Sequence, residues 1–129
     1  IYQIADMIAS QGDVTVLHVK DYIKCPKPNG YKSYHMVVTV PVYLTDGPVE
    51  TKVEIQIRSV AMDFWASLEH KIAYKFEGNA PANLLKELKA CADMVDMLDG
   101  KMFSLNEAIT AFARKQQEEM QAKAGTKEA

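Results

Sequence analysis

The strongest constraint on the fold is a stretch of alternating apolar and polar residues from 49 to 58. It follows Asp46-Gly47, a dipeptide that strongly favours a hairpin turn, and a valine-rich run over residues 31–44 precedes that turn. Valine favours strands because branched side chains pack well on a pleated surface. We therefore predict an antiparallel hairpin with alternate side chains on opposite faces. The apolar face holds Met36, Val38, Val40, Val53, Ile55 and Ile57.

The opposite, polar face of the hairpin is the first candidate for a functional site. A two-residue Asp46-Gly47 loop would pair Thr45 with Pro48. The next pairs on this face would be Thr39 with Glu54, Val37 with Gln56, and His35 with Arg58. A longer loop would shift these pairs but keep each side chain on its face, because the side-chain period is two. The face is either a solvated outer surface or a site built from Tyr31, Ser33, His35, Glu54, Gln56 and Arg58.

The remaining segments predict an α+β domain. Strands followed by segregated helices are typical of an antiparallel or mixed β-sheet with helices packed on one face. Prolines, a glycine and an asparagine exclude a regular element from residues 21–30. Around that loop we expect a short helix over residues 1–10, a strand over 14–20 and a helix over 60–76.

A long C-terminal helix is predicted over about residues 81–121. Its apolar residues keep a 3-4 spacing for more than three heptads, at Leu88, Cys91, Val95, Leu98, Met102, Leu105, Ile109 and Phe112. We favour one helix over a pair broken at Gly100 that folds back on its own domain. About 40 helical residues span about 60 Å, twice the diameter of a small domain. We therefore predict a homo-oligomer through this helix, followed by a flexible tail over residues 123–129.

Composition excludes several functional classes. A net charge of −2 argues against nucleic-acid binding by bulk charge, and no apolar run approaches the roughly 18 residues of a membrane span. Cys25 and Cys91 form no disulfide framework, so a reducing cytoplasm is expected. Against this background, a proline-stiffened loop rich in lysine suits a polyphosphate ligand. Its lysines and those flanking it are Lys20, Lys24, Lys27 and Lys32.

Two motifs carry a family resemblance. KPNGYKSYH at residues 27–35, followed by VEIQIR at 53–58, resembles the RelA/SpoT-type synthetase domain. FWASLEH at 64–70 and AYK at 73–75 fit as well. Among these proteins, the chain is most similar to the single-domain small alarmone synthetases. The resemblance implies a nucleotidyltransferase-like synthetase fold and synthesis of (p)ppGpp, with pyrophosphate moving from ATP to the 3′-hydroxyl of GTP or GDP.

The resemblance also implies roles for individual residues. Tyr31 would stack on guanine, and His35 would reach toward the phosphates of the acceptor. Glu54 would be the catalytic carboxylate, binding Mg²⁺ and assisting deprotonation of the ribose 3′-hydroxyl. The acceptor-binding residues would be Lys24, Lys27, Asn29, Gly30, Tyr31, Lys32, Ser33, His35 and Gln56.

The chain departs from the family pattern in one respect. In the family, the ATP-binding residues and the second Mg²⁺ ligand lie upstream of the segment that begins at Ile1. Residues 1–122 therefore resemble the acceptor-nucleotide half of one synthetase domain. We expect this chain alone to be inactive and the parent protein to be a GTP diphosphokinase. Resemblance to the small synthetases favours a tetramer, with a dimer as the alternative.

Two functions from other classes remain as alternatives. One is a non-catalytic module that binds guanine nucleotides or single-stranded RNA, with bases stacked on the exposed face at Tyr31. The other is a purely structural oligomerisation domain, which explains the long helix but not the basic loop.

Overall fold

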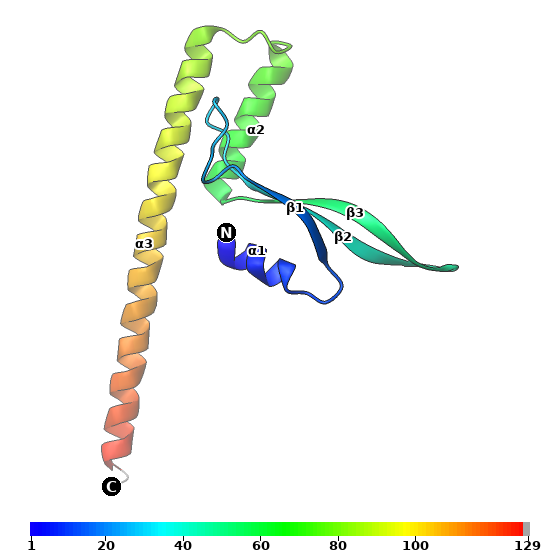
Figure 1. Ribbon diagram of the computed structural model, residues 1–129. Helices are drawn as coiled ribbons and strands as arrows, with labels where there is room; N and C mark the ends of the chain where they lie inside the picture. Colours follow the sequence, from blue (N-terminus) through cyan, green and yellow to red (C-terminus); the bar gives the residue numbers. More distant parts are fainter. Residues whose placement is uncertain (128–129) are drawn as a thin grey trace. The chain divides into compact units, whose positions relative to one another are not determined.

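The computed structural model describes residues 1–127 and has the predicted order of elements (Figure 1). The chain divides into two units, residues 1–95 and 96–129, and the boundary falls inside the last helix. The elements are α1 (Tyr2–Ala9), β1 (Thr15–Asp21), β2 (Tyr34–Leu44), β3 (Gly47–Ile57), α2 (Val60–Lys75) and α3 (Ala82–Lys127). The α+β fold class is confirmed.

The three strands form an antiparallel sheet in the order β1-β2-β3. The predicted pairing between β2 and β3 is wrong by two residues, since Val37 pairs with Glu54 and His35 with Gln56. The turn consists of Thr45 and Asp46, and Gly47 follows at φ +117° as the first residue of β3. A type I′ loop at Asp46-Gly47 needs positive φ at both central residues, and Asp46 does not have it. Within β2 and β3, the two-residue shift nevertheless leaves each side chain on its predicted face.

The apolar face of the sheet is covered by α1. Met36 and Val38 of β2 are fully buried there, together with Ala5 of α1. Ile55 and Ile57 of β3 pack against the same cluster. Because this face is occupied, any ligand site on the sheet must lie on the opposite face.

A second core cluster joins α2, the first turns of α3 and the loop before β2. Trp65, Leu88 and Ala92 are buried in it, and Tyr31 packs against them. The Ser59 hydroxyl caps α2 by accepting a hydrogen bond of 3.1 Å from the backbone N–H of Met62. These contacts fix α2 beside the loop that carries the predicted nucleotide-binding residues.

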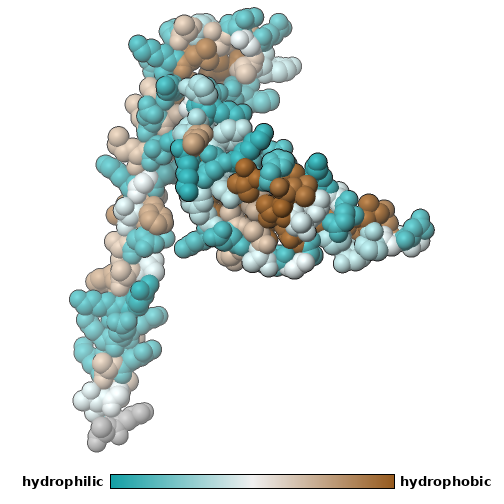
Figure 2. Space-filling model, in the orientation of Figure 1, coloured by the Kyte–Doolittle hydropathy of each residue, from teal (hydrophilic) through white to brown (hydrophobic). Residues whose placement is uncertain are grey.

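The helix α3 runs without a break through Gly100, as predicted. It continues to Lys127, past the expected end near residue 121, so residues 123–127 are helical rather than a separate tail. Residues 128 and 129 of that tail lie outside the described residues. Apolar side chains are interspersed with polar ones along α3 (Figure 2). In its second part the exposed large ones are Met97, Leu98, Met102, Phe103, Leu105, Ile109, Phe112 and Met120.

None of the described helices combines the length and the hydropathy needed to cross a membrane.

Candidate functional site

A polar cavity of about 320 Å³ lies over the face of the sheet that α1 leaves uncovered. All three strands contribute to it, and so does the loop between β1 and β2. Glu54 comes from β3 and His35 from β2, and both were predicted to share this face. The full lining is His18, Lys20, Tyr22, Lys27, His35, Val37 and Glu54. The cavity therefore gathers one carboxylate, two lysines and two imidazoles.

The contribution of β1 to this cavity was not predicted. Lys20 pairs with His35 across the sheet, and His18 pairs with Val37. A bulge between Val16 and His18 shifts the register at this point, which keeps the two basic side chains on the polar face. The alternation of His18 and Lys20 in the sequence indicated that the two side chains share one face of β1. The strand order and the bulge, which bring that face to the cavity, could not be inferred from one sequence.

His35 connects the catalytic candidate Glu54 to the ring of Tyr31. Its Nδ1 lies 3.1 Å from Oε1 of Glu54, and its Nε2 lies 3.0 Å from the Tyr31 hydroxyl oxygen. The His35 side chain is 13% exposed, against 54% for Glu54. Burial lowers the pKa of His35 and outweighs the opposing effect of Glu54, while Lys27 and Arg58 lower this pKa further. By its position, His35 acts as a hydrogen-bonding group between Tyr31 and Glu54.

The ring of Tyr31 borders one cavity and contacts a lysine that lines the other. On the sheet side, Lys27 Nζ lies 5.1 Å from the ring centroid of Tyr31 and 5.0 Å from that of Tyr22, within cation–π range. On the α2 side, the ring borders a cavity of about 410 Å³ that also contains Asp63 and His70. A planar base can stack on a half-buried aromatic ring that borders a cavity in this way.

Arg58 orients the polar end of Tyr31. Its Nη1 donates to the Tyr31 hydroxyl oxygen at 3.4 Å. Its Nη2 donates to Oε1 of Gln56 at 3.0 Å, and its Nε lies 3.2 Å from Oδ1 of Asp63. The guanidinium thus braces β3 against α2, which is a structural role.

The loop before β2 is held in shape by Asn29 and Gly30. Oδ1 of Asn29 accepts a hydrogen bond of 3.0 Å from the backbone N–H of Tyr31. Gly30 has φ +98°, and a Cβ placed there would lie 2.7 Å from Cβ of Ala92. A glycine is therefore required because the loop backbone packs directly on α3, in addition to any approach of a nucleotide.

Asp21 fixes the start of the same loop. Its Oδ1 accepts the backbone N–H groups of Ile23 at 2.9 Å and Lys24 at 3.0 Å, and its Oδ2 accepts the Tyr2 hydroxyl at 2.8 Å. Burial by itself would raise the pKa of Asp21, but these three donors hold it below the ordinary value. Burial, with the Asp21 hydrogen bond, raises the pKa of Tyr2 to about 12.

Of the predicted acceptor-binding residues, only Lys27 and His35 line the Glu54 cavity, and Ser33, Lys24 and Lys32 have other surroundings. Ser33 is buried, and its hydroxyl donates to the backbone oxygen of Ile57 at 3.3 Å, so the side chain serves the fold. Nζ of Lys24 lies 5.4 Å from the ring centroid of Tyr2. Lys32 lines a small gap beside Trp65. Strand alternation fails for Ser33 because β2 begins at Tyr34, not at Tyr31.

The remaining predicted residue, Gln56, lies beside Glu54 on β3. Its Nε2 donates to Oε1 of Glu54 over a long 3.4 Å. Gln56 also borders a cavity of about 450 Å³ shared with Arg58 and Asp63. Gln56 thus lies between Glu54 and the cavity lined by Arg58 and Asp63.

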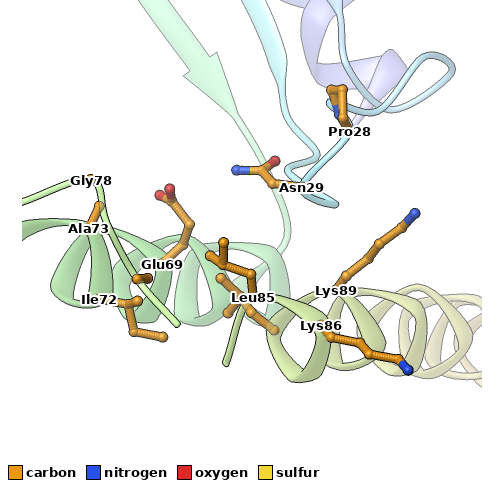
Figure 3. A pocket seen from close by; sticks show the side chains of 11 residues that line it. Pro28, Asn29, Glu69, Ile72, Ala73, Gly78, Leu85, Lys86 and Lys89 are labelled. Atoms are coloured by element: carbon orange, nitrogen blue, oxygen red, sulfur yellow. The ribbon is translucent and has the colours of Figure 1, made fainter. Parts of the chain in front are cut away.

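A larger cavity of about 540 Å³ lies between the loop, α2 and the start of α3 (Figure 3). Ile72 and Leu85 give it apolar walls, and Asn29 and Glu69 reach toward it. The ammonium groups of Lys86 and Lys89 point away from it in Figure 3. Because these lysines are not directed inward, this cavity suits polyphosphate less well than the smaller one beside Glu54.

The residues present fit a cation that is shared with substrate. No cluster of three or more His, Cys, Asp or Glu side chains able to hold a metal occurs among residues 1–127. A single partly exposed carboxylate such as Glu54 is nevertheless typical of Mg²⁺ sites, because Mg²⁺ is often bound by one or two carboxylates together with substrate phosphates and water.

Comparisons with known proteins show the family to which the chain is related. The family model "Region found in RelA / SpoT proteins" matches residues 1–79. GTP pyrophosphokinase YwaC of Bacillus subtilis is 46% identical over 109 residues, covering 84% of this chain and 52% of that protein. The crystal structure of small alarmone synthetase 2 from B. subtilis aligns with a TM-score of 0.80 at 47% identity, covering 83% of this chain and 58% of that one.

A third relative carries a bound nucleotide. The structure of small alarmone synthetase 1 from B. subtilis, bound to its product pppGpp, aligns with a TM-score of 0.76 at 37% identity. The alignment covers 81% of this chain and 54% of that one. The chain spans about half the length of the curated relatives it matches.

Proposed function

This chain belongs to the RelA/SpoT family, and on that premise we propose that it forms the acceptor side of a (p)ppGpp synthetase. The reaction is the transfer of pyrophosphate from ATP to the 3′-hydroxyl of GTP or GDP. Relatives at 46% and 39% identity are named GTP pyrophosphokinases. The full-length protein that carries this chain is therefore a GTP diphosphokinase.

The observation that carries the proposal is the position of Glu54. Its carboxylate lies in a cavity with Lys20 and Lys27, and His35 connects it to the aromatic wall of Tyr31. In the reaction, the ribose 3′-oxygen attacks the β-phosphorus of ATP and forms a new P–O bond. The bond from that phosphorus to the oxygen of the leaving AMP breaks, AMP takes the electron pair, and Glu54 accepts the 3′-hydroxyl proton.

Mg²⁺ is the cofactor we propose for this site, with Glu54 as its ligand from this chain. When bound, the ion would neutralise negative charge on the transferring phosphates. Glu54 provides an anionic oxygen at the cavity edge, and His35 keeps that oxygen directed by a hydrogen bond.

For the acceptor, we propose that guanine stacks on Tyr31 and that Lys20 and Lys27 bind phosphate oxygens. The ring of Tyr31 borders the cavity beside α2, and Lys27 lies over the ring on the sheet side. The proposed guanine position and the proposed phosphate position therefore meet at Tyr31. The pppGpp bound to the relative from B. subtilis supports a guanine nucleotide as the ligand class.

Thin-layer chromatography of labelled ATP with GTP or GDP, using the full-length protein, tests the activity. We expect transfer of the labelled β,γ-pyrophosphate to the guanine nucleotide. Tyr31→Ala should weaken GTP or GDP binding by about 1–3 kcal/mol, the value of one base–aromatic stack, with little change for ATP. No transfer, with guanine nucleotides or single-stranded RNA still bound, would support the non-catalytic alternative instead.

We further propose that the protein is a homo-oligomer assembled through α3, with a tetramer as the favoured state. The support is the row of apolar side chains that the second unit leaves exposed. A cytoplasmic location is proposed because both cysteines, Cys25 and Cys91, are free and exposed.

A further inference from the structure

We infer that the hydroxyl of Tyr31 has a role separate from its ring: through His35 it positions the carboxylate of Glu54. The inference rests on the proposed function, because it concerns the same acceptor site. It makes Tyr31 a positioning residue as well as a stacking residue, so acceptor binding and catalysis are separable at one side chain.

With a neutral imidazole at His35, the hydrogen-bond geometry fits the following arrangement. A guanidinium can only donate hydrogen bonds, so the Tyr31 oxygen accepts from Nη1 of Arg58 at 3.4 Å. The Tyr31 proton is then directed to Nε2 of His35, 3.0 Å away. A neutral imidazole with Nε2 as acceptor carries its proton on Nδ1. That proton is donated to Oε1 of Glu54 at 3.1 Å.

Packing holds the middle of the chain in place. The ring of His35 makes edge contacts with Tyr22 at 5.1 Å and with Tyr31 at 5.8 Å between centroids. Tyr31 in turn packs against the buried Trp65, with centroids 6.4 Å apart. The imidazole therefore has little freedom to turn away from Glu54.

The orientation of the Glu54 carboxylate depends on the hydrogen bond from His35. It stands on an exposed strand face with 54% of its side chain exposed, and an exposed glutamate samples several rotamers. Its other hydrogen bond, from Nε2 of Gln56, is longer at 3.4 Å. The bond from His35 is thus the main contact that directs the carboxylate into the cavity.

Removing the Tyr31 hydroxyl would release His35 at one end. The imidazole could then take the other tautomer or rotate, and Glu54 would lose its fixed donor. The aromatic ring would remain for stacking. Small misplacements of a reacting group are expensive, since a shift of about 1 Å can cost about a hundredfold in rate.

The test compares Tyr31→Phe with Tyr31→Ala in the full-length protein. Tyr31→Phe should bind GDP by calorimetry within about threefold of wild type, because the stacking ring remains. Its kcat should fall by about tenfold or more, with KM for the acceptor little changed. Tyr31→Ala should lose both binding and turnover. Tyr43→Phe removes the same atom from an exposed ring at the hairpin tip and should match wild type.

A second pair of variants addresses the link through His35. Gln at this position can still donate to Glu54, whereas Leu cannot. We therefore expect His35→Gln to retain more turnover than His35→Leu, with similar melting temperatures for the two.

The outcomes separate this inference from the proposed function. Wild-type protein that neither binds GDP nor transfers pyrophosphate would contradict the proposed function. An active wild type with kcat of Tyr31→Phe within twofold of its own would overturn the positioning role. Equal loss of turnover in His35→Gln and His35→Leu would also count against it.

Discussion

The indole Nε1 of Trp65 donates a hydrogen bond of 2.8 Å to the backbone carbonyl oxygen of Leu88. This contact fastens α2 to the first turns of α3, and both residues are buried. Tyr31 packs on the same cluster, and Gly30 lies against Ala92 one helical turn beyond Leu88. The loop that carries the proposed nucleotide-binding residues is therefore supported by a helix pair that contributes little to the Glu54 cavity itself.

Trp65→Phe should lower the free energy of unfolding by about 2–4 kcal/mol. The change removes one hydrogen bond, worth about 1 kcal/mol, and leaves a cavity in a packed core. Urea unfolding followed by circular dichroism measures the effect, since the chain has one tryptophan and fluorescence would be lost. Phe64→Leu alters the neighbouring aromatic, which is 74% exposed, and should change stability by less than about 0.5 kcal/mol. Equal effects of both changes would contradict the importance of the Trp65 contact.

Gly30→Ala should destabilise the protein by more than about 1 kcal/mol, because alanine is strained at positive φ. The added Cβ would also lie 2.7 Å from Cβ of Ala92, so loop or helix must move. GDP affinity, measured by calorimetry, should fall with it. Gly12→Ala is the matched control, since nothing lies within 4 Å of its added Cβ and its φ is not positive. A Gly30→Ala protein as stable as Gly12→Ala would disprove the close approach to α3.

Glu54→Gln should abolish pyrophosphate transfer, because the amide can neither accept the proton nor bind Mg²⁺ well. GTP affinity should stay within about tenfold of wild type, because guanine stacking on Tyr31 does not involve Glu54. Turnover is followed by thin-layer chromatography and binding by calorimetry. Glu50→Gln makes the same change farther along β3, where Glu50 pairs with Pro41, and should leave turnover unchanged. Near-wild-type turnover in Glu54→Gln would remove this residue from its catalytic role.

Much of the fold could be predicted because strand and helix periods are local properties of the sequence. The faces of β2 and β3 follow from alternation, which is why His35 and Glu54 were placed on one face although their predicted partners were wrong. The register depends on backbone dihedrals in the turn, where Asp46 keeps negative φ and Gly47 alone is positive. Composition does not determine which turn type forms.

The site was predicted less completely because long-range pairing decides which side chains meet. His18 and Lys20 enter the cavity through the pairing of β1 with β2 and through one bulge. Ser33 has the right parity, but it precedes β2 and turns inward to Ile57. The role of Gly30 against Ala92 joins residues that are far apart in the chain, so no local pattern could indicate it.

Asp21 should make stability depend on pH in the acid range. Its folded-state pKa is lowered, so the unfolded chain binds more protons, and stability falls as pH falls. The contribution is complete above the unfolded pKa of about 4 and is lost as pH drops through the folded value. Asp21→Asn should therefore flatten unfolding free energy against pH below about 4, measured by urea titrations. Asp13→Asn, at an exposed turn, should retain the wild-type slope; an unchanged slope in Asp21→Asn would contradict the prediction.

The exposed apolar residues of α3 predict that the protein assembles into a homo-oligomer through this helix. Leu98 and Leu105 occupy equivalent heptad positions and are 52% and 59% exposed. Burying a leucine side chain stabilises by about 1.5–3 kcal/mol, so a second copy that covers this row would gain substantially. Replacing both leucines with Asp places two charges in the seam and should yield monomers by light scattering. The pair Ser104→Asp and Thr110→Asp adds the same charge away from the seam and should leave the oligomer intact. An unmodified full-length protein that is monomeric at tens of micromolar would refute assembly through α3.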